Sequence, residues 1–392
     1  MELVLSMCLL SLMASTTGAS NVGQGISATP AIFDGTVYFP SWDGCIYAVK
    51  ASNGGLVWKK MLQQLTGLNS TRAVSNIDPN ITVSRTTPVI AHDLLIFGMS
   101  GPAYVVAVKR SNGELVWLTQ LDKQPKAIIT MSGTYYNGHF YVGTSSSEVT
   151  VSIEQCCIFR GSFVKLNART GKILWRTYIL PDNFGQRGEY AGASIWGSSP
   201  SIDIRRNHVY IGTGNLYLHL KIKWNCLALD RDNGNLIWST EAGPGGLAGG
   251  GTWGAATDEK RVYTNIANSG RKNFTLQPSS KVTTAGGWVA MDSKNGRILW
   301  STADPSNGTA SGPVTVANGV LIGGSTFRQG PIYAMNTKSG EILWSYETGA
   351  TIYGGASVSN GCIYIGHGYK VTLGLFNPEY TAGNSLFAFC VA

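Results

Sequence analysis

The chain has 392 residues, of which 49 are Gly, 11 are Trp, 17 are Tyr and only 13% are charged. This composition suits many short strands joined by tight turns and argues against a predominantly helical protein. The net charge of +8 comes from Lys and Arg residues scattered along the chain. Because a nucleic-acid-binding surface shows a basic stripe with interleaved aromatic residues, we expect no nucleic-acid partner.

The N-terminus carries an apolar run from Leu3 to Met13 that is followed by small residues, as in a signal peptide. The run is too short to span a bilayer, and no later segment resembles a membrane span. We therefore expect a secreted protein in which residues 1–20 are a signal peptide and residues 21–392 form one domain. Because Glu2 and no Lys or Arg precedes the run, the alternative is an altered N-terminus whose apolar run serves as a strand.

The cysteines and sequons add little to this picture. None of the seven cysteines forms a CxxC or CxxCH sequence, so the chain indicates neither a zinc knuckle nor covalent c-type haem attachment. Four Asn-X-Ser/Thr sequons are compatible with a secretory route and with a glycoprotein. They begin at Asn69, Asn80, Asn273 and Asn307.

A phrase of about eleven residues recurs six times along the chain. Each copy has the end of a strand, a polar turn closed by Gly, and an apolar strand that reaches Trp four residues after the Gly. Gly adopts the positive φ that such a turn needs, so each copy predicts a β-hairpin. The constant spacing places every indole on the same face of its strand. The copies are Ala48–Trp58, Ala107–Trp117, Val164–Trp175, Ala228–Trp238, Ala290–Trp300 and Ala334–Trp344.

A second pattern lies upstream of each copy: Ser, Thr or Gly, often followed by Pro, then an apolar pair, a turn and another strand. The two patterns together make four strands. A seventh instance is not followed by a Trp strand, so a closed ring would need its missing strand from the N-terminus. The seven instances begin at Thr29, Thr87, Ser132, Ser199, Gly254, Gly312 and Gly354.

This repetition predicts an all-β propeller of four-stranded blades, because a unit repeated in fixed register must stack on its neighbours to bury its faces. Successive Trp residues are 59, 58, 63, 62 and 44 residues apart, whereas a blade needs only about 40 to 45 residues. The extra residues lie between blades, at 62–84 and 180–193, and inside blades, at 145–159 and 268–284. Such insertions on a rigid scaffold are where we expect function.

The AxDxxTGxxxW pattern resembles the tryptophan-docking motif of the pyrroloquinoline quinone (PQQ) repeat, and the likeness extends from about Ser27 to the end of the chain. The resemblance implies a propeller of W-shaped blades, normally eight, of which seven units are recognisable here. The segments CCIFRGSFVKLNARTGKILW and GPGGLAGGGTWGAATDEKRVYTN are most similar to the polyvinyl-alcohol-dehydrogenase-like subgroup. The implied function is that of a PQQ-dependent alcohol dehydrogenase, with a small or polymeric alcohol and an electron acceptor as partners.

The same resemblance implies a cofactor site, residue by residue. It places Thr130 on the quinone and Glu148, eighteen residues later, on calcium. In the next unit Trp196 would stack on the quinone plane and Asn215 would be a second calcium ligand. Arg85 occupies the position of an arginine close to the quinone oxygens. These residue types suit the chemistry, because calcium prefers oxygen ligands and an anionic planar cofactor prefers an arginine and an aromatic platform.

The adjacent Cys156 and Cys157 resemble the vicinal disulfide of PQQ alcohol dehydrogenases, although in those enzymes the pair lies in an earlier blade. Two alternatives follow for this pair: a disulfide near the cofactor, or two separate thiols. Trp253 is a candidate for the cofactor side of the central funnel or for packing between blades.

The chain also departs from the family pattern. The family's catalytic Asp lies in a long segment after the residue matched by Asn215, whereas only the nine residues Leu216 to Trp224 precede the next phrase here. The expected Asp is absent, and Lys221 and Lys223 are imperfect matches to a cofactor-facing lysine. Two functions therefore stay open: a PQQ-dependent oxidoreductase, impaired by this loss or not, and a non-catalytic secreted propeller used for binding. An outer-membrane assembly propeller with PQQ-like repeats is a less favoured third.

Overall fold

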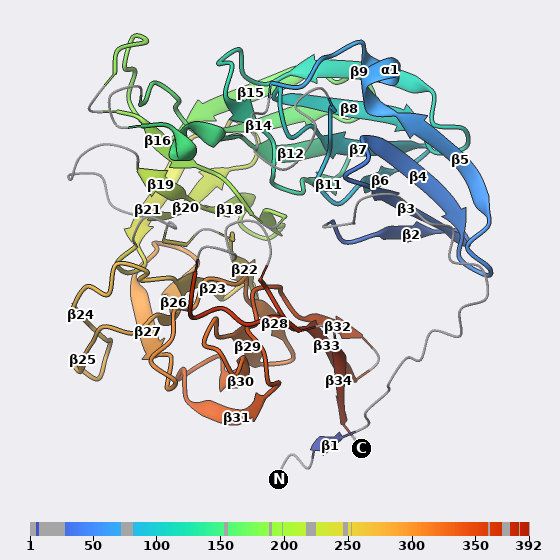
Figure 1. Cartoon of the computed structure of the whole chain (residues 1–392). Coiled ribbons are helices and arrows are strands. Elements are labelled where there is room, and N and C mark those ends of the chain that lie inside the picture. Colours follow the sequence, from blue (N-terminus) through green and yellow to red (C-terminus); the bar gives the residue numbers. More distant parts are fainter. Residues whose placement is uncertain are drawn as a thin grey trace.

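A computed structural model of the chain describes residues 5–7, 28–71, 81–152, 156–187, 190–197, 199–216, 225–245, 250–251, 253–359, 361–370, 377–383 and 385–391. Within these residues it contains seven antiparallel four-stranded sheets, which follow one another around an arc (Figure 1). The predicted all-β propeller is confirmed. No helix in the described part is long and apolar enough to cross a membrane.

The first four blades use the strands in chain order, from the innermost to the outermost. Blade 1 contains β2 (Ala31–Phe33), β3 (Thr36–Pro40), β4 (Cys45–Lys50) and β5 (Leu56–Met61). Blade 2 contains β6 (Val89–Ala91), β7 (Leu94–Gly98), β8 (Tyr104–Lys109) and β9 (Leu115–Gln120). Blade 3 contains β11 (Thr134–Tyr136), β12 (His139–Gly143), β14 (Ser162–Asn167) and β15 (Ile173–Tyr178). Blade 4 contains β17 (Ser201–Asp203), β18 (His208–Gly212), β20 (Asn225–Asp230) and β21 (Leu236–Glu241).

The remaining three blades repeat this order. Blade 5 contains β22 (Ala256–Thr257), β23 (Arg261–Ile266), β26 (Gly287–Asp292) and β27 (Ile298–Ala303). Blade 6 contains β28 (Thr315–Ala317), β29 (Val320–Gly324), β30 (Pro331–Asn336) and β31 (Ile342–Glu347). Blade 7 contains β32 (Ser357–Ser359), β33 (Cys362–Gly366), β34 (Leu386–Val391) and, as its outermost strand, β1 (Leu5–Met7).

Smaller elements lie in the connections. Three two-stranded sheets are formed by β10 (Ala127–Ile128) with β13 (Ser145–Ser146), β16 (Gly192–Ser194) with β19 (Gly214–Leu216), and β24 (Phe274–Thr275) with β25 (Val282–Thr283). The helices are α1 (Leu62–Thr66) and the short 3₁₀ helix η1 (Ser147–Thr150).

The N-terminal strand supplies the pairing that a closing blade needs. β1 runs antiparallel to β34, with Leu5 opposite Val391, and it is three residues long. In the same blade Cys362 lies opposite Cys390, and the two are joined by a disulfide across β33 and β34. The ribbons of the first blade (blue) and the last blade (dark red) stand apart in Figure 1, in contrast to the other consecutive blades.

Each of the first five phrase Trp residues docks on the turn of the next blade. The indole Nε1 donates to a backbone oxygen of that turn over 2.9–3.1 Å. In four of the five cases a Thr hydroxyl two residues later donates to the carbonyl of the turn Gly. The acceptors are Arg110 for Trp58, Ala168 for Trp117, Arg231 for Trp175, Ser293 for Trp238 and Thr337 for Trp300.

The turn Gly is required for two reasons. All six phrase glycines have positive φ, between 70° and 78°. A Cβ added at Gly171 would also lie 2.5 Å from the Trp117 ring, and one at Gly340 would lie 2.5 Å from the Trp300 ring. The indole of one blade therefore packs flat against the backbone of the next. Trp344 has no following phrase, and its ring instead lies 5.0 Å from that of Phe389 in blade 7.

Most of the apolar core lies between consecutive blades. One buried cluster joins blades 1 and 2 through Ile46, Trp58, Leu95 and Val106. Corresponding clusters join each later pair of consecutive blades, as far as blades 6 and 7. A single blade could not bury its faces alone, as the repeat predicts.

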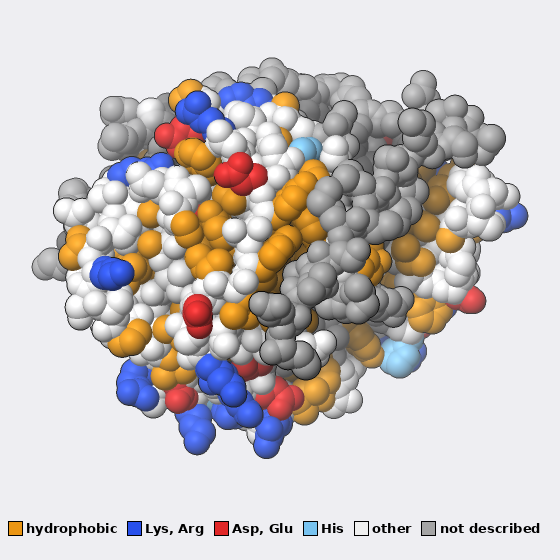
Figure 2. Space-filling model, turned by 90° about the horizontal axis from the view of Figure 1, so that it is seen from below, with side chains coloured by type: hydrophobic (Ala, Val, Ile, Leu, Met, Phe, Trp, Pro, Cys, Tyr) orange, Lys and Arg blue, Asp and Glu red, His pale blue; other side chains and the backbone are white. Residues whose placement is uncertain are grey.

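The insertions and the linkers between blades share one face of the propeller. The strands of a blade are antiparallel, so the linker that enters strand 1 lies at the same end as the loop that follows strand 2. The turns closed by Gly lie at the opposite end. We call the first end the loop face; it carries the linkers before β6, β11, β17, β22, β28 and β32 and the loops after β7, β12, β18, β23, β29 and β33. On the side of the molecule in Figure 2, Lys and Arg side chains are interspersed with Asp and Glu.

Docking can be tested with two glycines that share a positive φ and differ in their neighbours. Gly340→Ala places a methyl group against the Trp300 ring at φ +74°, whereas Gly138→Ala at φ +79° meets no atom within 4 Å. We expect Gly340→Ala to cost about 3 kcal/mol and Gly138→Ala about 1 kcal/mol, since only the first adds overpacking to backbone strain. Urea unfolding midpoints of the two variants provide the measurement. Equal losses would show that the indole contact does not hold the blades together.

Candidate functional site

The linkers of the loop face place corresponding residues around the propeller axis. Arg85, Thr130 and Tyr353 each stand four residues before the first paired residue of an innermost strand. Equal register on successive blades puts them at the same height on the loop face. The linkers that carry Thr130, Trp196 and Tyr353 are also tied to the preceding blade. The N–H groups of Ile129, Ile195 and Ile352 donate to the carbonyls of Met99, Thr144 and Ser325, respectively.

Thr130 and Trp196, two of the predicted site residues, lie next to each other. The buried Thr130 hydroxyl donates to the Trp196 carbonyl over 2.8 Å and lies 2.9 Å from the Ser145 hydroxyl. Ser145 belongs to β13, which lies next to β16. Thr130 therefore fastens the Trp196 linker to the insertion of blade 3, and its oxygen still has a lone pair available.

The indoles of Trp196 and Trp253 occupy neighbouring linkers. Trp196 is half-buried, and its Nε1 has no hydrogen-bond partner among the described residues. The Trp253 ring packs on Gly197, where a Cβ would lie 2.5 Å from it. Because Gly197 follows Trp196 directly, the Trp253 ring lies against the backbone of the Trp196 linker.

Tyr353 joins this cluster on the far side of Trp253. The two rings meet edge to face with centroids 5.3 Å apart, and Tyr369 stacks on Tyr353 at 4.0 Å. Tyr380 lies 6.2 Å from Tyr353. Burial raises the pKa of Tyr353 well above its usual range, and the positive charge of Arg85 acts in the opposite direction.

The three tyrosines were not predicted as site residues. The available signal was the register: Tyr353 occupies the same position before its strand as Arg85 and Thr130 do before theirs. Tyr369 and Tyr380 lie in the loop between β33 and β34, where the repeat has no counterpart. Their approach to Tyr353 has no sequence signal.

Glu148 is held by hydrogen-bond donors. Its buried carboxylate accepts from the Gln124 amide at 2.6 Å, from the Ile158 N–H at 3.2 Å and from the Phe159 N–H at 3.0 Å. Ser146 caps η1 by accepting from the Glu148 N–H. The carboxylate thus closes the insertion of blade 3 on itself and on the linker from blade 2.

Cys156 and Cys157 form a vicinal disulfide across a cis peptide bond, and both are buried. The Cys156 Sγ lies 4.0 Å from the Glu148 carbonyl oxygen, and the N–H groups of the two residues that follow the disulfide bind the Glu148 carboxylate. The pair and Glu148 therefore form one unit.

The other predicted residues are described only in part or not at all. Asn215 lies in β19 between Gly214 and Leu216. These two residues pair with Ser194 and Gly192 of β16, so the Asn215 backbone lies beside the Trp196 linker. The Asn215 side chain lies outside the described residues, as do Lys221 and Lys223. Across the described residues no group of three or more His, Cys, Asp or Glu side chains is placed to hold a metal ion.

The residues on the loop face suit a planar, negatively charged ligand better than a hard cation. Trp196, Trp253 and Tyr353 offer ring surfaces, and Arg85, on the linker of blade 2, carries a guanidinium, a group that pairs well with carboxylates. The Glu148 carboxylate accepts three N–H groups, so a calcium ion bound there would share its oxygens with these donors.

Comparison with known proteins gives one family and relatives of several kinds. The profile of the PQQ_2 family, described as outer membrane protein assembly factor BamB, matches residues 13–216 and 223–373. A polyvinylalcohol dehydrogenase from a Pseudomonas species is 25% identical over 91% of this chain and 69% of that protein. The polyvinylalcohol dehydrogenase of Sphingopyxis sp. strain 113P3 is 24% identical over the same shares. BamB of Legionella pneumophila is 23% identical over 65% of this chain and 52% of that protein.

Solved structures agree on the fold. BamB from Moraxella catarrhalis superposes with a TM-score of 0.59 at 13% identity, covering 94% of this chain and 86% of that one. The quinohemoprotein alcohol dehydrogenase of Comamonas testosteroni gives 0.51 at 16% identity, covering 94% and 74%. At these identities the likeness extends to the propeller architecture alone.

The hydrogen bonds that the Glu148 carboxylate accepts across the blade 3 insertion predict an effect on stability. Glu148→Ala leaves the buried Phe159 N–H and its neighbour without an acceptor, so we expect a loss of about 2 kcal/mol in the free energy of unfolding. Glu114→Ala removes an exposed carboxylate paired with Lys109 and serves as the control, for which we expect no measurable change. Urea titration monitored by Trp fluorescence measures both. A Glu148→Ala variant as stable as the control would show that the hydrogen bonds of Glu148 do not stabilise the fold.

Proposed function

Because this chain belongs to the family of PQQ-repeat propellers, we propose that it is a quinoprotein-type oxidoreductase that oxidises an alcohol to a carbonyl compound. The observation that carries the proposal is the aromatic cluster of Trp253, Tyr353 and Tyr369, which lies against the Trp196 linker and in the same register as Arg85. The similarity to polyvinylalcohol dehydrogenases over 91% of the chain supports the same activity class.

The chain's own residues would hold the cofactor in defined ways. The Arg85 guanidinium would pair with the carboxylates of PQQ, and the Trp196 and Trp253 indoles would cover its planar ring system and keep water away. The Thr130 hydroxyl, already bound to the Trp196 carbonyl, would keep this linker in place. When bound, PQQ supplies a two-electron oxidant for the alcohol, and a separate electron acceptor must then reoxidise it.

Calcium takes no part in the steps proposed here. Glu148 is occupied by N–H donors, and the side chain of the second predicted ligand, Asn215, lies outside the described residues. Cys156 and Cys157 act through the same unit, as a rigid support of the blade 3 insertion. We assign no proton acceptor, because the segment after Asn215 lacks the Asp that the family pattern would place there.

A second candidate is a propeller that binds a partner without redox chemistry. The absence of an Asp in the segment after Asn215 favours it, since no residue is then assigned to accept the alcohol proton. BamB of Legionella pneumophila, an assembly factor by its name, is a relative of this second kind. We propose secretion for either candidate on the basis of the sequons, because part of the N-terminal apolar run pairs with β34 as β1 in this structure.

Quinone binding separates the two candidates. We expect the purified full chain to retain PQQ after desalting, with quenching of its Trp fluorescence, and to reduce a dye with a secondary alcohol. Arg85→Met should weaken PQQ binding about 10- to 100-fold, because it removes a hydrogen bond to a charged group. Lys109→Ala, at the opposite end of blade 2, is the control and should leave binding unchanged.

The outcomes are clear-cut. Retained PQQ with dye reduction supports the oxidoreductase. A chain that retains no PQQ, or an Arg85→Met variant that binds it as well as the unaltered protein, would contradict the proposal and leave the binding propeller. A chain that retains PQQ but reduces no dye with any alcohol would have the family's cofactor site without the oxidoreductase activity.

A further inference from the structure

The outer hairpins of the propeller divide into a basic half and an acidic half. An outer hairpin consists of the third and fourth strands of a blade and the Gly-closed turn between them. The outer hairpins of blades 1–3 together carry nine Lys or Arg residues and one Glu. Those of blades 4–6 carry four Lys or Arg residues and six Asp or Glu residues. The same repeated unit therefore has opposite charge on the two sides of the ring.

Four cations of the basic half form no ion pair among the described residues. Lys50, Arg169 and Lys172 are exposed in or beside the Gly-closed turns. Lys60 occupies a position of β5 that is Thr in the outermost strands of blades 2–5. Its stem packs on the turn of blade 2, where a Cβ at Gly113 would lie 2.8 Å from the Lys60 Cγ. Lys60 thus places a charge at the boundary between blades 1 and 2.

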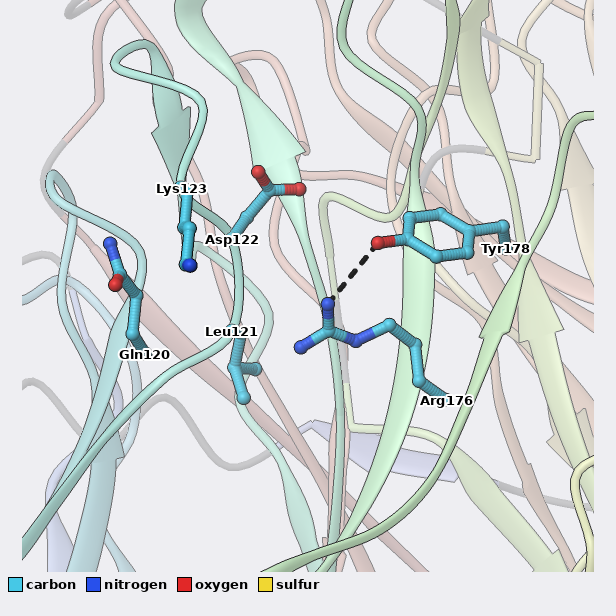
Figure 3. A pocket seen from close by; sticks show the side chains of 6 residues that line it. All are labelled: Gln120, Leu121, Asp122, Lys123, Arg176 and Tyr178. Carbon is cyan, nitrogen blue, oxygen red and sulfur yellow. Dashed lines mark hydrogen bonds between the residues drawn. The ribbon is translucent and has the colours of Figure 1, made fainter. Parts of the chain in front are cut away.

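Other cations of these hairpins are engaged within the protein. Lys59 and Lys109 form ion pairs with carboxylates. Lys165 is buried. The Arg176 Nη1 donates to the Tyr178 hydroxyl over 3.2 Å, at the end of β15 that lies on the loop face (Figure 3). We therefore assign none of these four cations to a binding surface.

Exposed aliphatic side chains accompany the four unpaired cations. The outermost strand of each blade begins with an apolar pair directly before its Trp, at the end of the blade opposite the loop face. In blades 1–3 this pair contributes the exposed residues Leu56, Val57, Leu115, Val116 and Leu174.

We call these five residues, together with Lys50, Lys60, Arg169 and Lys172, the basic turn surface. The phrase Trp has the same pairing register in all three blades. The turns therefore lie at one end of the propeller, where a flat partner can reach three blades at once.

Both components of the basic turn surface are those that a charged lipid surface attracts. Cations close to an anionic bilayer are held by its surface potential, and aliphatic side chains enter the boundary between headgroups and acyl chains. Blade 4 has a matching apolar pair, Leu236 and Ile237, but Asp230 and Asp232 lie in the turn before it. Charge, and not apolar exposure alone, therefore distinguishes blades 1–3.

We propose that the basic turn surface docks on an anionic lipid bilayer. A nucleic acid would instead favour aromatic side chains between the cations, and the basic turn surface contains none. Docking at this end would direct the loop face, at the opposite end of the blades, away from the bilayer. No residue of the candidate site takes part, so the proposal holds whether or not the chain binds a quinone.

Co-sedimentation of the full chain with lipid vesicles tests the charge component. We expect binding to vesicles of phosphatidylglycerol and phosphatidylcholine, weakened by added salt, and no binding to phosphatidylcholine alone. Lys50→Gln combined with Lys60→Gln should weaken binding about 25-fold, because each cation near an anionic surface contributes about fivefold. The matched control is Lys294→Gln combined with Lys338→Gln, which removes the same charge from exposed turns of the acidic half. It should bind as the unaltered protein does.

A second pair of variants tests the apolar component. Leu56 is 61% exposed and Leu236, at the same position of the phrase in blade 4, is 54% exposed, so neither substitution disturbs the core. We expect Leu56→Ser to weaken vesicle binding about fivefold, since the aliphatic chain no longer enters the bilayer. Leu236→Ser should leave vesicle binding unchanged.

Three outcomes would overturn the proposal. The first is the absence of binding to the anionic vesicles. The second is an equal loss in the two double Lys variants, which would show a response to net charge and not to the basic turn surface. The third is binding that Leu56→Ser leaves unchanged and that soluble heparin abolishes, which would assign the surface to a soluble polyanion.

Discussion

The stacking of an indole on a glycine turn in the next blade is the contact on which this propeller depends. It combines a flat apolar surface, a hydrogen bond from Nε1 and, in most blades, a Thr hydroxyl on the same turn. Because each blade is held by the next, the apolar core forms between sheets and continues around the arc. The contact leaves the loop face unconstrained, so linkers and insertions there can vary without loss of the fold.

The repeat made the architecture predictable from sequence. Six phrases in fixed register predicted hairpins, four-stranded blades and seven units, and the structure contains all of them. The seventh unit is not followed by a Trp strand, so the sequence predicted that the N-terminus would supply the fourth strand. In the structure β1 pairs with β34 at that place. The contacts between blades can be predicted from the periodicity because the same interaction recurs. A copy of the phrase that is ambiguous by itself can therefore be interpreted from the other copies.

The site was predictable only where it shares that register. Thr130 and Trp196 were matched to the family pattern, and they are joined by a hydrogen bond. Tyr369 and Tyr380 approach Tyr353 from a loop that has no counterpart in the repeat, so no periodicity points to them. The partners of Glu148 could not be predicted either, because the Gln124 amide and two backbone N–H groups carry no sequence signature. The Glu148 carboxylate stabilises the blade 3 insertion through its hydrogen bonds, whereas the family resemblance makes it a metal ligand.

The central claim is that the repeated phrase holds the fold while the loop face alone carries quinone binding. Hydrogen exchange of the full chain with and without PQQ, read by mass spectrometry, tests it most directly. We predict new protection in the linkers around Arg85, Thr130, Trp196 and Tyr353 and unchanged exchange in the turns that contain Gly113, Gly171 and Gly234. Protection centred on those glycine turns, or no change anywhere on addition of PQQ, would contradict the account.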